Sequence, residues 1–101
     1  MRSYDLTKKA DADLKAVTIY TIQQWGAPQA KRYLQLLHAG CESLAKGEGL
    51  IKHLEDINPD LYLSRCEHHY LLCLRRTGKR PRIVAVFHER MDIITRIKNR
   101  L

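Results

Sequence analysis

The stretch Arg82–Asp92, which reads RIVAVFHERMD, decides the fold of this chain. Its segment Ile83–Phe87 is a nearly continuous run of apolar residues, most of them β-branched. Such a run is typical of a strand that is buried on both faces or central in a sheet. Asp92 can cap the first turn of a helix with its side chain. The apolar residues that follow at helical spacing are Ile93, Ile94, Ile97 and Leu101. We therefore predict a buried strand, a charged hinge with a packed Met91, and a short C-terminal helix.

Two further strand-like runs precede this stretch. Leu61–Cys66 is the first and Tyr70–Leu74 is the second. Thr77–Pro81 then reads as a turn, and Pro81 cannot occupy a central strand because it has no backbone N–H group. Strands that follow one another through short turns usually pair antiparallel. These runs and Ile83–Phe87 therefore predict three consecutive antiparallel strands.

The first half of the chain has the period of two helices. Thr7 can cap the first helix, and Gly26 can end it in a left-handed conformation. Pro28 suits the first turn of a second helix, which Gly47 can close. The apolar face of the first helix consists of Ala10, Leu14, Val17, Thr21, Ile22 and Trp25, and that of the second of Ala30, Tyr33, Leu34, Leu37, Cys41 and Leu44. Because the link between the two helices is very short, we expect an antiparallel helical hairpin.

The order of these elements predicts the fold class. Residues 1–6 are compatible with one further strand, and residues 48–60 read as a loop. The expected order is β-α-α-β-β-β followed by a short C-terminal helix. This order predicts an α+β fold in which the helical hairpin packs on a small, mostly antiparallel sheet. With 101 residues, the chain is expected to form a single domain over 1–101.

Charge is unevenly distributed along the chain. The net charge is +7, from 18 basic and 11 acidic residues. Residues 75–101 contain nine basic and only two acidic side chains. A basic end of this kind suits nucleic acid, an acidic protein or an anionic surface. No apolar run is long enough to span a bilayer, and residues 1–6 lack the apolar stretch of a signal peptide. We therefore expect a cytoplasmic protein with no membrane partner.

The residue types that carry metal or cofactor chemistry are poorly placed. Cys41, Cys66 and Cys73 form no C-x-x-C pair and are interpreted as core residues. His68 and His69 are adjacent, so on a strand they would point to opposite faces. No phosphate-binding loop or nucleophile elbow is present. We predict no metal site, no cofactor and no catalytic residue.

Metal-free RNA cleavage is the enzymatic alternative. It needs a base for the 2′-hydroxyl, a cation for the phosphate and an acid for the leaving oxygen. His88 offers a base, and the nearby arginines Arg82, Arg90 and Arg96 offer cations. A second proton carrier is missing from this region, since no tyrosine follows Tyr70.

Four pieces of the chain resemble the ParE branch of the RelE/ParE toxin superfamily. They are Leu6–Leu14, the helix junction Gln24–Gly26, the strand pair Ser64–Leu74, and Arg82–Asp92. The last piece is the most specific, because ParE-like chains often read I-L-x-I-L/F-H-x-R-M-D there. The similarity covers essentially the whole chain. Two features depart from the family pattern: Cys73 stands near a position that is often aromatic, and the turn Arg75–Arg82 is unusually basic.

The resemblance implies a cytoplasmic toxin held inactive by a cognate antitoxin, which wraps the helical hairpin and the sheet. ParE members inhibit DNA gyrase, whereas RelE members are ribosome-dependent messenger ribonucleases with a Tyr or His near the C-terminus. Here Met91–Ile94 stands where that tyrosine would be. We therefore expect a non-enzymatic gyrase inhibitor of a type II toxin–antitoxin system. A ribosome-dependent messenger ribonuclease, and a chain that binds only an antitoxin, are the alternatives.

The expected partners are a ParD-like antitoxin, in a hetero-oligomer, and DNA gyrase, alone or with its DNA. Trp25 is interpreted first as a core anchor at a helix end, and as an antitoxin contact in the alternative. Arg90 fits a structural ion pair as well as a target contact. The residues predicted to contact the target are Arg82, Arg90, Met91, Arg96, Lys98 and Arg100. Those predicted to contact the antitoxin are Trp25, Tyr33, Leu37 and Tyr62.

Overall fold

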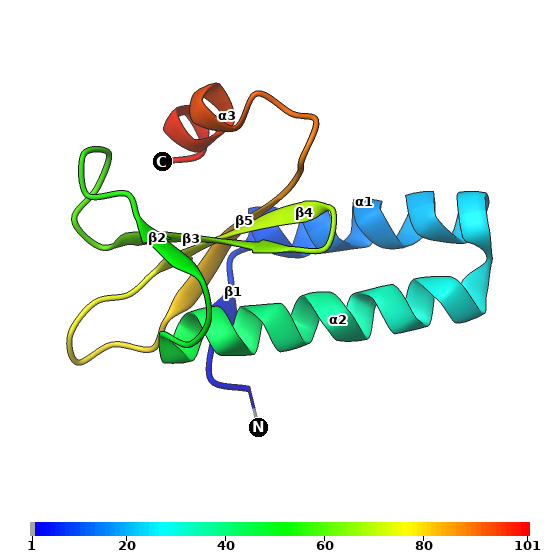
Figure 1. Ribbon diagram of the computed structural model, residues 1–101, viewed down its shortest axis with the longest axis horizontal. Helices are drawn as coiled ribbons and strands as arrows, with labels where there is room; N and C mark the ends of the chain where they lie inside the picture. Colours follow the sequence, from blue (N-terminus) through cyan, green and yellow to red (C-terminus); the bar gives the residue numbers. More distant parts are fainter. Residues whose placement is uncertain (1) are drawn as a thin grey trace.

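The computed structural model describes residues 2–101 (Figure 1). A hairpin of two long helices covers one face of a five-stranded sheet, and a third, short helix packs on the other face. The elements are β1 (Asp5–Leu6), α1 (Lys8–Trp25), α2 (Ala27–Lys46), β2 (Ile51–His53), β3 (Leu61–Cys66), β4 (His69–Leu74), β5 (Arg82–His88) and α3 (Ile93–Arg100). The predicted α+β class is confirmed, and so is the predicted order of elements apart from the additional strand β2. None of the helices in the described part is long and apolar enough to cross a membrane.

The sheet has the strand order β1-β5-β4-β3-β2. Only the β1–β5 pair is parallel, so the sheet is mostly antiparallel as predicted. The prediction that residues 48–60 form only a loop is wrong, because Ile51–His53 pairs with β3. Two of the three side chains of β2 are exposed. A strand of this length is too short to show an alternating pattern in the sequence.

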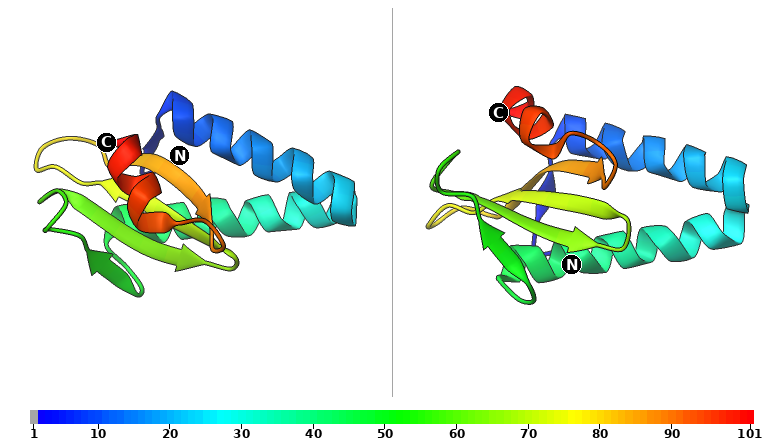
Figure 2. Two further views of the ribbon diagram at one scale, coloured as in Figure 1. Left: turned by 90° about the horizontal axis from the view of Figure 1, so that it is seen from above. Right: turned by 45° about the horizontal axis from the view of Figure 1, so that its top comes forward.

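The two long helices begin and end at the residues that the sequence predicts. The side chain of Thr7 accepts a hydrogen bond from the Ala10 N–H group and caps α1. Gly26 is the only residue between α1 and α2, and its φ of 89° lies in the range that favours glycine. Gly47 closes α2 in the left-handed conformation. The one-residue link turns α2 back alongside α1 (Figure 2).

The sheet separates two apolar clusters, and β5 contributes to both. Ile83 and Val86 pack under the hairpin, whereas Val84, Ala85 and Phe87 pack under α3. The prediction that this strand is buried on both faces is therefore confirmed. The pairing with β4 shifts by one residue at Val84, which places Val84 and Ala85 in the same cluster.

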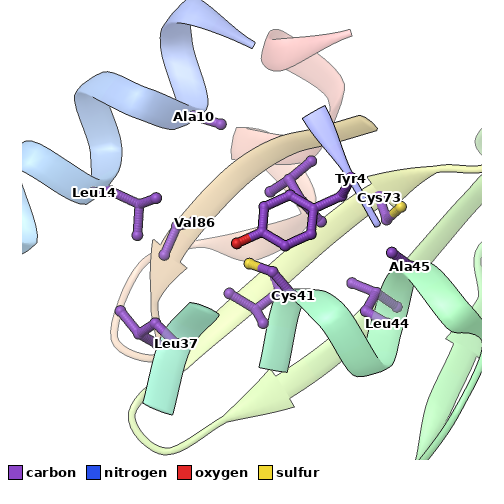
Figure 3. Close-up of a cluster of buried hydrophobic side chains, with 11 residues drawn as sticks. Tyr4, Ala10, Leu14, Leu37, Cys41, Leu44, Ala45, Cys73 and Val86 are labelled. Atoms are coloured by element: carbon purple, nitrogen blue, oxygen red, sulfur yellow. The ribbon is translucent and has the colours of Figure 1, made fainter. Parts of the chain in front are cut away.

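Tyr4 is the largest fully buried side chain of the hairpin cluster, where it lies beside Cys41 (Figure 3). Its hydroxyl group is 2.6 Å from Nδ1 of His38 on α2, so the one polar atom of the buried ring has a partner. Cys41 and Cys73 are buried, as the sequence predicts, whereas Cys66 is only half-buried. Burial raises the pKa of the Cys41 thiol to about 12. The N-terminal segment is thus fixed to α2 through the core.

An ion pair completes the outer edge of β5. Because β1 has only two residues, it pairs with β5 no further than Ile83. Beyond that point the Asp13 carboxylate of α1 accepts the Val86 N–H group at 3.0 Å, and Arg100 Nη1 of α3 donates to the Val84 carbonyl at 2.9 Å. The two side chains also bind each other through two hydrogen bonds of 2.9 and 3.2 Å. Their side chains are only 19% and 17% exposed. The pair therefore joins α1, β5 and α3.

Arg100→Gln is expected to lower the free energy of unfolding by about 2–3 kcal/mol, because it leaves a largely buried carboxylate without its counter-charge. Urea unfolding followed by circular dichroism measures this loss. Arg96→Gln is the matched control, because Arg96 is exposed on the same helix. It should change the unfolding free energy by less than about 0.5 kcal/mol. Equal effects of the two substitutions would contradict the role given to Arg100.

Candidate functional site

α3 starts at a fixed point of the chain. The Asp92 carboxylate accepts hydrogen bonds from the Thr95 hydroxyl at 2.8 Å and from the Thr95 N–H group at 3.4 Å. These bonds lower the pKa of the Asp92 carboxyl. The predicted helix cap is therefore confirmed. Ile97 is fully buried against the sheet, which turns the opposite side of α3 outward.

The outward side of α3 and the residues before it combine apolar and basic side chains. Met91 is 39% exposed, so the prediction that it is packed is wrong. It lies in a bend before the helix, where no other element covers it. Ile94, in the first turn of α3, is 54% exposed, and Leu101, directly after the helix, is 50% exposed. We call this the α3 surface; its exposed residues are Arg90, Met91, Ile94, Arg96, Lys98 and Leu101.

Of the predicted target contacts, Arg82, Arg90, Met91, Arg96 and Lys98 are all exposed. Arg100, by contrast, is only partly exposed and is not free to contact a target. Its guanidinium group binds Asp13 and the Val84 carbonyl, and lies 4.9 Å from the centre of the Phe87 ring. We therefore correct its assignment to a structural one. The sequence carries no signal for this role, because Asp13 lies 87 residues away.

The turn between β5 and α3 is held by its own polar contacts. The Arg90 N–H group donates to Nδ1 of His88 at 3.1 Å. Glu89 forms an ion pair with Arg65 on β3 and lies 3.2 Å from Nδ1 of His68, in the turn between β3 and β4. The backbone of Arg90 is thus fixed, whereas its side chain is exposed and takes no part in an ion pair of the described part.

A buried polar pair joins α2 to the sheet near the same turn. The Tyr33 hydroxyl accepts the His68 N–H group at 3.1 Å and shares a second hydrogen bond of 2.6 Å with Nδ1 of His69. Burial, together with His88 and His68, lowers the pKa of His69 to about 4. Burial also raises the pKa of the Tyr33 hydroxyl. Both groups are therefore neutral near pH 7, and Tyr33 is half-buried rather than an open contact residue.

Arg82 is not brought near His88, the base considered for RNA cleavage. Arg82 and His88 lie at opposite ends of β5, which places their Cα atoms about 20 Å apart. Nδ1 of His88 already accepts the Arg90 N–H group. Within residues 2–101 there is also no group of three or more His, Cys, Asp or Glu side chains that could hold a metal ion.

The far end of the helical hairpin extends beyond the sheet and exposes apolar side chains (Figures 1 and 2). Trp25 is 72% exposed there, so its interpretation as a core anchor is wrong, because no strand reaches that end of α1. Ile22 was expected on the buried face but is also exposed. We call this the hairpin surface; its exposed apolar residues are Ile19, Tyr20, Ile22 and Trp25 on α1, together with Leu36, which lies further from the tip, in the middle of α2 beside Cys66 of β3.

Two other predicted antitoxin contacts lie elsewhere. Leu37 is 0% exposed and belongs to the core, so its assignment as a contact residue is corrected. Tyr62 is half-buried in β3, with the His53 ring stacked on it at 4.4 Å and the Arg75 guanidinium group 4.8 Å from its ring centre. Sequence reasoning missed Ile19, Tyr20 and Leu36. The available signal was that α1 and α2 carry more apolar residues than one buried stripe requires.

The family model for the ParE toxin of type II toxin–antitoxin systems, parDE, matches residues 4–93. The chain belongs to the ParE toxin family. It is 46% identical over 101 residues to Toxin ParE of Escherichia coli, which covers 100% of this chain and 98% of that one. It is 32% identical over 92 residues to Toxin ParE1 of Caulobacter vibrioides, which covers 91% and 94%.

A solved structure described as a chromosomal ParDE TA system from P. aeruginosa has the same fold. Its TM-score is 0.69 at 23% identity, over 87% of this chain and 96% of that one. The resemblance to the ParE branch is thus confirmed. The family model's match ends at Ile93, the first residue of α3. Four residues of the α3 surface, Ile94, Arg96, Lys98 and Leu101, therefore lie beyond the part that the family model describes.

The buried His69 gives the stability of this ParE chain a specific pH dependence. The folded-state pKa of about 4 is below the usual value of 6.5, so the unfolded state binds the proton more readily. This contribution is complete above pH 6.5 and is lost as the pH falls toward 4, by up to about 3 kcal/mol. In urea unfolding at a series of pH values, His69→Gln should lose less stability than the wild type across this range.

His53→Gln serves as the control for this measurement, because it replaces an exposed histidine that lies outside the Tyr33–His69 pair. Parallel pH profiles for the wild type and His69→Gln would contradict the assignment.

Proposed function

We propose that this chain is the toxin of a type II toxin–antitoxin pair, that it inhibits DNA gyrase without catalysing a reaction, and that a ParD-like antitoxin neutralises it. Membership of the ParE family and the ParDE system of the structural neighbour support the toxin role and a complex with an antitoxin. Because gyrase acts on DNA in the bacterial cytoplasm, the proposed function also implies that the protein is cytoplasmic. The observation that carries the gyrase assignment is the α3 surface.

The α3 surface has the composition of a protein contact rather than of a reactive centre. Exposed Met91, Ile94 and Leu101 supply apolar contact area, and Arg90, Arg96 and Lys98 add positive charge in the same segment of the chain. Methionine and arginine are enriched at protein interfaces. Opposite charge on a partner speeds association and fixes its orientation. The surface is also held rigidly, since Ile97 and Arg100 fasten α3 to the sheet.

Messenger cleavage receives less support from the same region. A metal-free nuclease needs its acid, base and cation within reach of one phosphate. Arg82 and His88 are separated by the length of β5, and the buried Tyr33–His69 pair is neutral and fully engaged. Inhibition by binding requires none of these groups.

The antitoxin is assigned to the hairpin surface. Exposed apolar side chains on two neighbouring helices suit the apolar face of an amphipathic segment. Trp25 and Tyr20 are the largest of them, and aromatic side chains commonly supply most of the energy of an interface. Tyr33 and Leu37 lie deeper on α2, where Tyr33 is bonded to His69 and Leu37 belongs to the core.

Charge reversal on α3 tests the target assignment. Arg90→Glu/Arg96→Glu is expected to raise the concentration needed to inhibit gyrase supercoiling tenfold or more, because two favourable charge contacts become repulsive. Lys31→Glu/Arg32→Glu, with the same charge change on exposed residues of α2, should inhibit like the wild type. If both double variants lost inhibition equally, the effect would come from the net charge and not from contacts of the α3 surface. Unaltered supercoiling together with messenger cleavage on translating ribosomes would overturn the gyrase assignment.

Truncation of Trp25 tests the antitoxin assignment. Trp25→Ala should weaken binding of the cognate antitoxin about 30-fold in isothermal titration calorimetry, because an interface tryptophan typically contributes about 2 kcal/mol. The substitution should leave the unfolding free energy and the inhibition of gyrase nearly unchanged. Leu37→Ala should instead cost about 2–5 kcal/mol of stability. Wild-type affinity in the Trp25→Ala variant would refute the proposed contact.

A further inference from the structure

The loop between β4 and β5 concentrates basic residues at one end of the sheet. Residues 75–82 contain five arginine or lysine side chains and no acidic one. The loop turns tightly, with the Lys79 N–H group bonded to the Arg76 carbonyl and Gly78 at a φ of 79°. It lies at the end of the molecule opposite the tip of the helical hairpin (Figures 1 and 2). Neither the α3 surface nor the hairpin surface includes it.

The loop and the adjacent strands form a shallow groove. Its lining residues are Asp5, Leu74, Arg76, Lys79, Arg80 and Arg82. Asp5, Arg82 and Leu74 are aligned across β1, β5 and β4 by the strand register. Leu74 packs against the cluster beneath α3, and side chains in register share a face of the sheet. The groove therefore opens on the face of the sheet that also carries α3.

The four cations of the groove are not all neutralised. Arg80 binds the Asp5 carboxylate at 3.1 Å and the backbone carbonyls of Arg2 and Tyr4. Arg76 lies 3.4 Å from a carboxylate oxygen of Asp60. Lys79 and Arg82 form no ion pair within residues 2–101, and both are exposed. Lys79 and Arg82 thus give the groove two unpaired positive charges, and the contacts of Arg80 fix the loop to the N-terminal segment.

We propose that this basic groove binds the phosphate backbone of duplex DNA. Lysine and arginine side chains at the edge of a shallow groove suit repeated phosphates, and such contacts need no particular base sequence. The lining contains no aromatic side chain on which an unpaired base could stack, which favours a duplex over a single strand. Leu74 is the only apolar residue of the lining, which favours phosphate over a protein surface. The choice of duplex DNA as the ligand rests on the proposed function, because gyrase binds duplex DNA.

The test uses the full-length toxin without antitoxin and a fluorescently labelled random-sequence duplex of about 30 base pairs. Anisotropy titrations at several salt concentrations give the affinity and its salt dependence. Lys79→Glu/Arg82→Glu should bind the duplex at least tenfold more weakly. The slope of the logarithm of affinity against that of salt should fall by about two, one for each lost phosphate contact. Lys31→Glu/Arg32→Glu has the same net charge and should retain the wild-type slope.

Three results would overturn the assignment. They are an equal loss of duplex binding in the two double variants, tighter binding of single-stranded RNA than of the duplex, and equally tight binding of a polyglutamate peptide of matched charge. The titration contains no gyrase, so its outcome is independent of the proposed inhibition. If the toxin bound the duplex through the groove but did not affect supercoiling, the gyrase assignment would be refuted. The assignment of the groove to DNA binding would still stand.

Discussion

The ion pair between Asp13 and Arg100 lies where three elements of the fold meet. β5 is buried on both faces, yet β1 is too short to pair with its outer edge beyond Ile83. Asp13 accepts a backbone N–H group of this edge and Arg100 donates to a carbonyl group of it, so the two side chains replace a missing strand. Unsatisfied backbone groups at such a position would cost free energy comparable to lost hydrogen bonds. The same contact fixes α3 against α1, and with it the orientation of the α3 surface.

The sequence predicts those parts of the fold that depend on neighbouring residues. Thr7, Gly26 and Asp92 mark helix ends because a cap acts within one turn. The double burial of Ile83–Phe87 is visible because every residue of the run is apolar. Features that depend on distant contacts were missed. The strand Ile51–His53 forms only by pairing with β3, and the role of Arg100 depends on Asp13, which is distant in the sequence. Trp25 is exposed because the sheet does not extend to its end of α1. Leu37 is buried because α2 packs on the sheet.

The three surfaces of this ParE toxin differ in chemistry as well as in place. The hairpin surface is apolar, with the exposed Trp25 at its end, and suits an amphipathic segment of an antitoxin. The α3 surface mixes apolar side chains with arginine and lysine, and the basic groove beside Arg82 is almost purely charged. The α3 surface and the groove share one face of the sheet, whereas the hairpin packs on the other.

The central claim is that gyrase and the antitoxin contact different parts of the toxin. Hydrogen–deuterium exchange of the toxin, measured alone, with gyrase and DNA, and with its antitoxin, tests this claim most directly. We predict that gyrase slows exchange in residues 90–101, and that the antitoxin slows it in residues 19–36. Protection of the hairpin segment by gyrase, with residues 90–101 exchanging as in the free toxin, would contradict the account.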